Sequence, residues 1–130
     1  MGVIAPRDQV KLAALADIAH AAQHIYALTE QFAAARSLED RIAQQIKHRY
    51  GWFKRNLTTA GFDQVAQLAG SMATAAGRPG SQRMKARILR EGMSSIRHQL
   101  DMEERLIRKS SADEASERKE KKEKAAGEQL

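Results

Sequence analysis

The stretch LADIAHAAQHIYALTEQF, Leu15–Phe32, carries apolar side chains at alternating steps of three and four residues. This spacing is typical of one face of an α-helix. The residues on that face are Leu15, Ile18, Ala22, Ile25, Thr29 and Phe32. No Gly or Pro lies between Pro6 and Gly51 and β-branched residues are few, so we predict a helix of about 25 residues with Asp8 as its N-cap.

A second helix is predicted to follow the first after a short link. SLED, Ser37–Asp40, resembles a capping box with Ser37 as the N-cap, so this helix is expected to begin at Leu38. Its apolar face comprises Ile42, Ile46, Tyr50, Phe53 and Leu57. Gly51 interrupts the helix at a cost of about 1 kcal/mol relative to Ala. It either marks a close approach by a neighbouring group or is simply tolerated.

Two breaks divide the remainder of the chain. TTAG, residues 58–61, ends the second pattern, and GRPGS, Gly77–Ser81, contains Gly and Pro residues that cannot continue a helix. A third helix with small residues lies between them, and its apolar face comprises Phe62, Val65, Leu68, Ala69, Met72 and Ala76. Ser81 can cap a fourth helix from Gln82 to Lys109. The apolar face of that helix comprises Leu89, Met93, Ile96, Leu100 and Ile107.

The last segment, residues 110–130, is rich in Lys and Glu and has no residue larger than Ala on an apolar face before Leu130. It cannot bury enough apolar surface to offset the entropy of ordering, so we expect a disordered tail or a solvated helix. We therefore predict an all-α protein, a helical bundle of four to five helices in residues 1–109, followed by a charged tail in residues 110–130.

Composition narrows the possible functions. The chain has no Cys, which excludes disulfides, thiolate zinc sites and cysteine nucleophiles. No stretch contains the roughly 20 apolar residues of a membrane span, and the N-terminus lacks a signal-peptide pattern, so we expect a cytoplasmic protein. No nucleophile with a base, no paired carboxylates and no phosphate-binding glycine loop is evident, so we expect neither enzymatic activity nor a cofactor.

His20 and His24 stand four residues apart, so they face the same way on a helix and could share a metal ion. Asp17 precedes His20 by three residues, a partial match to the ligand spacing of di-metal bundles. His48 and His98 have no acidic residue at that offset. We favour surface or boundary histidines over a metal site.

Positive charge is concentrated in the middle and third quarter of the chain. Residues 47–77 carry a net charge of +3 and residues 78–109 carry +5, whereas residues 1–46 and 110–130 each carry −1. Arg83, Arg87 and Arg90 follow helical steps of four and three, and Arg97 continues this cationic stripe. Any amphipathic helix places polar residues outside. Nine cations against four acids between Arg78 and Lys109 nevertheless favour a surface that binds phosphates.

Aromatic residues accompany the cations in IKHRYGWFKRNL, Ile46–Leu57. Tyr50 and Phe53 continue the apolar face, whereas Trp52 lies about 100° from Phe53 on a helix, so we predict that Trp52 is at least partly exposed. It could stack on a base or anchor a protein interface. The full set of candidate nucleic-acid-binding residues is Lys47, Arg49, Trp52, Lys54, Arg55, Arg78, Arg83, Arg87, Arg90 and Arg97.

The segment KHRYGWFKRNLTTAGFDQVAQLAGSMATAAG, Lys47–Gly77, resembles the small helical subunits of multi-subunit CRISPR effector complexes. The similarity covers about 30 of the 130 residues, and the alanine-rich first helix and the charged tail have no counterpart in it. It implies a basic helical bundle that contacts a guide–target hybrid or a displaced strand. By this analogy the contacting residues would be Arg49, Lys54, Arg55, Arg83, Arg87 and Arg90.

The leading hypothesis is therefore a non-catalytic small subunit of a ribonucleoprotein that binds RNA or single-stranded DNA nonspecifically. Its other faces would bind copies of itself or other protein subunits, and the Leu15–Phe32 stripe is long enough for pairing between chains. One alternative is a helical adaptor or assembly protein whose basic face meets an acidic protein. Another is a DNA-binding accessory protein of phage or plasmid origin, although no clear helix-turn-helix spacing supports it. No membrane or small-molecule partner is expected.

Overall fold

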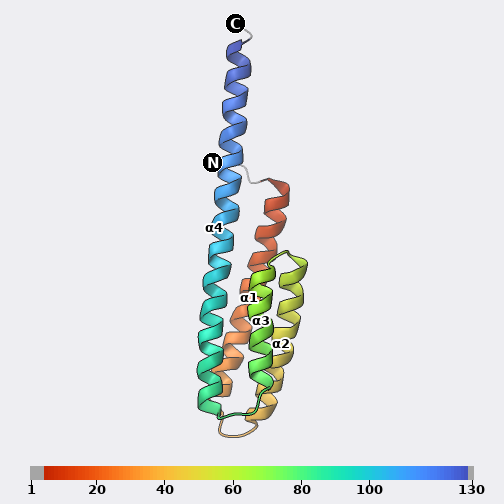
Figure 1. The fold of residues 1–130 in the computed structure, drawn as a ribbon, viewed down its shortest axis with the longest axis vertical. Helices are drawn as coiled ribbons and strands as arrows, with labels where there is room; N and C mark the ends of the chain where they lie inside the picture. Colours follow the sequence, from red (N-terminus) through yellow and green to blue (C-terminus); the bar gives the residue numbers. More distant parts are fainter. Residues whose placement is uncertain (1–4, 129–130) are drawn as a thin grey trace.

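The computed structural model describes the backbone of residues 5–128, and their side chains except those of residues 115, 118 and 120–128. Within this part of the chain the structure is all-α, as predicted. The helices are α1 (Pro6–Ala34), α2 (Glu39–Thr59), α3 (Asp63–Gly77) and α4 (Gln82–Glu128). Helix α1 packs on α2 and α4, and α3 packs on the same two helices, so the four form a bundle (Figure 1). None of the described helices is both apolar enough and long enough to cross a lipid bilayer.

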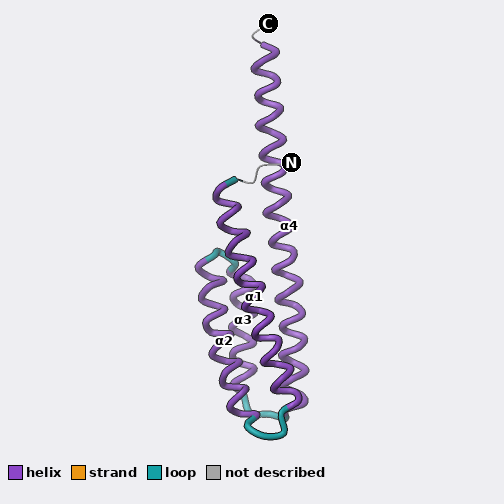
Figure 2. Tube along the Cα trace, turned by 180° about the vertical axis from the view of Figure 1, so that it is seen from behind, coloured by secondary structure: helices purple, strands orange, loops and turns teal. Residues whose placement is uncertain are grey.

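The short links make successive helices antiparallel, as in other up-and-down bundles. The α1–α2 link, residues 35–38, and the α3–α4 link, residues 78–81, lie together at one end of the molecule (Figure 2). We call this end the loop end. Helices α1 and α4 extend past the α2–α3 turn at the opposite end, where they are accompanied by no other described helix (Figure 1).

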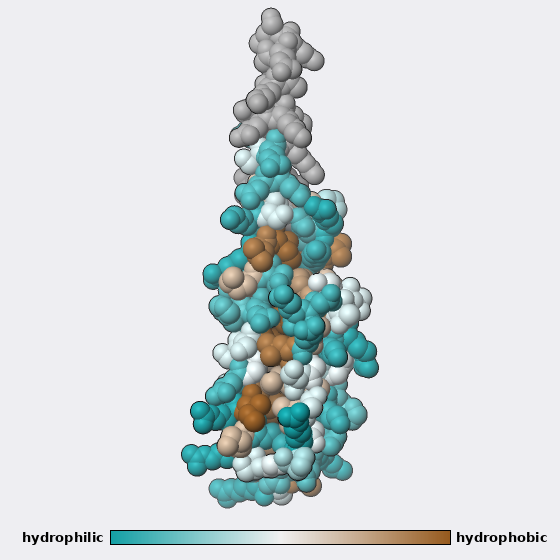
Figure 3. Space-filling model, viewed as in Figure 1, coloured by the Kyte–Doolittle hydropathy of each residue, from teal (hydrophilic) through white to brown (hydrophobic). Residues whose placement is uncertain are grey.

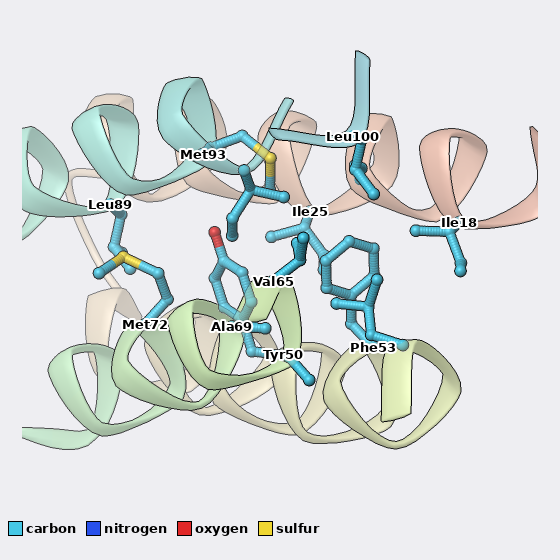
Figure 4. Close-up of a cluster of buried hydrophobic side chains, with 14 of the residues drawn as sticks. Ile18, Ile25, Tyr50, Phe53, Val65, Ala69, Met72, Leu89, Met93 and Leu100 are labelled. Atoms are coloured by element: carbon cyan, nitrogen blue, oxygen red, sulfur yellow. The ribbon is translucent and has the colours of Figure 1, made fainter. Parts of the chain in front are cut away.

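The core is built from the apolar faces that the sequence predicts. Ile25 of α1, Tyr50 and Phe53 of α2 and Met93 of α4 are each at most 1% exposed. Figure 4 shows these side chains converging between the helices, with small residues such as Ala69 leaving room for the aromatic rings. The whole Leu15–Phe32 stripe is buried within the chain. The expectation that this stripe pairs separate chains is therefore wrong, because α2 and α4 already cover it.

Two of the predicted helix caps are wrong. Helix α1 begins at Pro6 after Ala5, and Asp8 lies in its first turn, where the Ser111 hydroxyl donates a 2.5 Å hydrogen bond to its carboxylate. Leu38, in a left-handed conformation with φ of 61°, precedes α2, and no side chain caps that helix. The proposed Ser37 cap does not form. Ser81 does cap α4, since its Oγ accepts a 3.2 Å hydrogen bond from the Met84 amide.

Helix α4 continues well past the predicted end at Lys109, to Glu128. The segment after Lys109 is rich in Ala, Glu, Lys and Arg, which favour helix, and lacks Gly and Pro until Gly127. The tail is thus helical, one of the two forms expected for it. Its first residues still contact α1, through Ser111 on Asp8 and Glu114 on Arg7.

Candidate nucleic-acid interface

All ten candidate residues are exposed, so none is used in the core. Trp52 is 47% exposed, which confirms the prediction made for it. The ten do not form one surface, however. They divide among the α2–α3, α1–α2 and α1–α4 seams, the outer side of α2 and the link before α4, because each helix of the bundle turns a different side to its neighbours.

Helix α2 presents its candidates on two opposite sides. Lys47 and Lys54 lie over α3, where their side chains cover Gly77 and Gly70 respectively. Arg49 and Trp52 lie on the other side, in a depression of about 250 Å³ shared with α1. Lysines and Trp52 of this helix therefore cannot contact one straight strand together.

The depression beside Trp52 also contains both histidines of α1. The rings of His20 and His24 stand edge to face with centroids 5.1 Å apart. Across the described residues, no group of three or more His, Cys, Asp or Glu side chains is placed to hold a metal ion.

Helix α4 gathers the largest set of candidates on one surface. Arg83, Arg87 and Arg90 line a shallow groove of about 590 Å³ that begins at Ser81, beside the loop end. Arg83 and Arg90 also border a second depression of about 410 Å³ on the side of α1. The stripe predicted from the sequence thus exists, and it lies along the seam between α4 and α1.

Several arginines of this stripe have partners within the protein. Arg90 donates two hydrogen bonds, of 2.7 and 2.8 Å, to the Glu30 carboxylate, and this hydrogen bonding lowers the pKa of Glu30. Arg87 forms a 3.2 Å ion pair with Glu91 one turn away. The Arg97 guanidinium lies 5.8 Å from the ring centre of Tyr26. Arg83 has no ion pair among the described residues, so its charge is fully available.

Charge is polarised along the bundle. The half nearer the loop end, residues 27–49 and 74–93, contains nine Lys or Arg and four Asp or Glu. The other half, residues 5–26, 50–73 and 94–114, contains eight of each kind. The field of the described bundle is therefore positive at the loop end and close to balanced elsewhere.

Most cations at the loop end also lack an acidic partner. Among the described residues, only Arg87 and Arg90 of the nine form ion pairs. The seven others are Arg36, Arg41, Lys47, Arg49, Arg78, Arg83 and Lys85. In the other half, Arg7, Arg105 and Arg108 are paired with Glu114, Asp101 and Glu104. The five other cations of that half have no ion pair among the described residues either, but eight acids balance its eight cations.

Sequence reasoning missed Arg36, Arg41 and Lys85 as members of this surface. Arg36 and Arg41 belong to residues 1–46, whose net charge is −1, so a count along the chain hides them. The antiparallel topology brings the α1–α2 link next to the α3–α4 link and thereby adds these cations to Arg78 and Arg83 (Figure 2). Only the helix pairing could have revealed the complete set.

Comparison of the chain with protein-family models, with curated proteins and with solved structures gave no match.

Proposed function

We propose that this protein binds nucleic acid without sequence specificity and without catalysis, using the cations at its loop end. Phosphate groups would displace the hydration and counterions around unpaired Lys and Arg side chains, and release of counterions from the strand would supply the affinity. Contacts of this kind position a strand but read no bases.

The observation that carries the proposal is the excess of unpaired cations at one end of the bundle. Seven of nine Lys and Arg residues there have no ion pair among the described residues, against four acids in the same half. A protein that only needed a soluble surface would gain as much from interspersed charges of both signs, as in the other half. The shallow grooves beside Arg83 suit a flexible backbone better than a compact small molecule.

The resemblance of Lys47–Gly77 to small CRISPR effector subunits suggests a setting for this activity. In that setting the protein would be a cytoplasmic subunit of a ribonucleoprotein, and base pairing with a guide RNA would supply the specificity that the bundle lacks. The loop end would contact a guide–target hybrid or a displaced strand, and the remaining faces would contact other subunits.

Two double charge reversals test the proposal. Arg36→Glu with Arg83→Glu changes exposed, unpaired cations of the loop end, and Lys11→Glu with Lys109→Glu makes the same change of net charge in the other half. Binding of a labelled single-stranded oligonucleotide is measured against salt concentration. We expect the loop-end variant to lose roughly tenfold or more in affinity at low salt, and the control to lose much less. The slope of log affinity against log salt concentration should become shallower by about 1.4, since each of two lost phosphate contacts on a single strand contributes about 0.7.

Absence of binding by the unaltered protein at low salt would overturn the proposal. Equal losses in the two variants would also overturn it, since they would show attraction by total charge and no site at the loop end. Circular dichroism of each variant checks that the helices remain intact.

A further inference from the structure

A second surface lies on α4 beside the groove that Arg83, Arg87 and Arg90 line, and Met84 borders both. Four large apolar side chains of this helix are exposed, namely Met84 at 58%, Ile88 at 40%, Met102 at 45% and Leu106 at 57%. They lie symmetrically about Ser95, at seven and eleven residues before it and seven and eleven residues after it. At about 100° per residue, all four point within about 20° of the direction of Ser95. They therefore form one straight stripe along the helix.

The surroundings of this stripe carry little charge. Ser95 and Gln99 lie at its centre, and Glu91 is the one charged residue within about 40° of Ser95 between Ile88 and Met102. The neighbouring helix α3 contains no Lys, Arg, Asp or Glu after Asp63. Figure 3 shows separate apolar patches, in brown, along the side of the molecule on which α3 and α4 lie in front. Between Ile88 and Met102 a nucleic acid would find no cation within about 40° of Ser95, whereas Met84 borders the groove that Arg83 and Arg87 line.

We propose that this stripe is the contact surface between two copies of the chain, with their α4 helices antiparallel and a two-fold axis passing beside Ser95. The axis brings Met84 level with Leu106 of the second copy and Ile88 level with Met102 of the second copy. Every exposed apolar side chain of the stripe thereby gains an apolar partner. The small Ser95 side chains meet at the centre, where the helix axes can approach closely.

The polar neighbours of the stripe fit the same arrangement. Glu91 and His98 lie on the same side of the stripe, four residues before and three residues after Ser95. The two-fold axis therefore places Glu91 within one residue, about 1.5 Å, of the level of His98 of the second copy, and an imidazole N–H can donate to the carboxylate. Both side chains are exposed in the single chain, where Glu91 forms an exposed ion pair with Arg87 that it would exchange for His98.

A second copy fits this surface better than an unrelated protein does. Residues that pair across a two-fold axis must be spaced symmetrically about it, and an unrelated partner imposes no such condition. Met84 and Leu106 are 22 residues apart, about 33 Å at 1.5 Å per residue, so with the width of one helix, about 10–12 Å, the two α4 helices would bury roughly 700 Å² in total. That area is typical of a weak interface, so we expect a dimer that forms only at high protein concentration. The low charge also lets two positively charged chains meet there.

Cysteine cross-linking tests this arrangement directly, because the native chain has no Cys. Ser95→Cys should form a disulfide-linked dimer under mild oxidation, since the two residues meet at the axis. Ser94→Cys is the matched control, exposed and adjacent in sequence but turned about 100° away. A mixture of Ile88→Cys and Met102→Cys chains should cross-link between the two kinds of chain faster than either variant cross-links alone.

The second readout is the molar mass of the unmodified chain. It is measured by light scattering at protein concentrations from micromolar to several hundred micromolar. We expect a dimer that Ser95→Glu, which sets two carboxylates against each other, weakens at least tenfold. A monomer at all concentrations, or equal cross-linking of Ser94→Cys and Ser95→Cys, would overturn the proposal. Faster cross-linking of each single variant than of the mixture would overturn the antiparallel arrangement. None of these readouts depends on nucleic-acid binding, so this inference and the proposed function fail separately.

Discussion

Gly92 of α4 lies directly against Met72 of α3. A Cβ atom added to Gly92 would overlap the Met72 sulfur and stand 2.9 Å from both Cγ and Cε of that side chain. Gly51 of α2 has no such neighbour, since no atom of the described residues lies within 4 Å of an added Cβ there. The close approach suspected at Gly51 thus occurs at Gly92, and Gly51 is simply tolerated.

Alanine at these two glycines should therefore have opposite effects. We expect Gly51→Ala to raise the free energy of unfolding by up to about 1 kcal/mol, the helix-propensity gain. We expect Gly92→Ala to lower it by about 1–2 kcal/mol, because displacement of Met72 outweighs that gain. Chemical denaturation measures both changes. In a Met72→Ala background the loss at Gly92 should disappear, and a loss that persisted there would contradict the close contact.

Replacement of Tyr50 by Phe should raise the free energy of unfolding. Its hydroxyl is buried in the core without a hydrogen-bond partner among the described residues, and its side chain is 0% exposed (Figure 4). An unpaired buried hydroxyl costs about 1–3 kcal/mol. We expect Tyr50→Phe to raise the free energy of unfolding by about 1 kcal/mol at neutral pH, measured by urea denaturation. A clear loss of stability would show that the hydroxyl has a partner.

The same substitution should change the response to alkaline pH. Burial raises the pKa of Tyr50 above its ordinary value of 10.0. The folded state then keeps the phenol neutral where the unfolded chain would ionise it, so this contribution to stability is fully present below pH 10 and is lost as pH rises beyond it. We expect the stability advantage of Tyr50→Phe to grow above pH 10. An advantage that stayed constant would contradict burial of the phenol.

Glu30→Gln should release Arg90 for nucleic-acid binding. The pair is partly exposed, with side chains 38% and 48% accessible, so its loss should cost less than about 1 kcal/mol of stability. This expectation rests on the proposed function: oligonucleotide affinity at low salt should rise by roughly one order of magnitude or less. Asp101→Asn, which releases Arg105 in the other half with the same change of charge, is the control. An equal rise in both variants would argue against a site at the loop end.

Two truncations show how far α4 contributes to the folded bundle. A chain ending at Lys109 loses Ser111, whose hydroxyl satisfies the buried Asp8 carboxylate, and Glu114, which pairs with Arg7. A chain ending at residue 116 keeps both. We expect the shorter chain to be less stable by about 1–3 kcal/mol, chiefly because the hydrogen bond from Ser111 to the Asp8 carboxylate is lost. Identical thermal unfolding midpoints would contradict the structural role of these contacts.

The bundle itself was predictable because the heptad-like spacing of Leu15–Phe32 and its counterparts depends only on burial, which dominates helix packing. The residues at which α1 and α2 begin could not be predicted from the sequence. Asp8 and Ser37 have the right residue types for caps, but Pro6 already starts α1 and Asp8 is held by Ser111 of a distant helix. Tertiary contacts of this kind leave no local signal.

The candidate interface was predictable only in part. The stripe containing Arg83 and Arg90 follows from helical spacing on a single helix, whereas its neutralising partner Glu30 comes from α1. Arg36 joins the surface only because two loops meet at one end of the bundle. Residue spacing determines which side chains share one helix face, and helix pairing determines which faces combine.

A nuclear magnetic resonance titration of the isotope-labelled chain with a short single-stranded oligonucleotide tests the central claim most directly, since each backbone amide reports its own surroundings. We predict that chemical-shift changes concentrate at the α1–α2 link, the α3–α4 link and the first turns of α4, and that they vanish at high salt. Changes centred on the seam between α1 and α2 near Trp52, or on the Ile88–Leu106 stripe, would contradict binding at the loop end. So would a spectrum that no oligonucleotide alters.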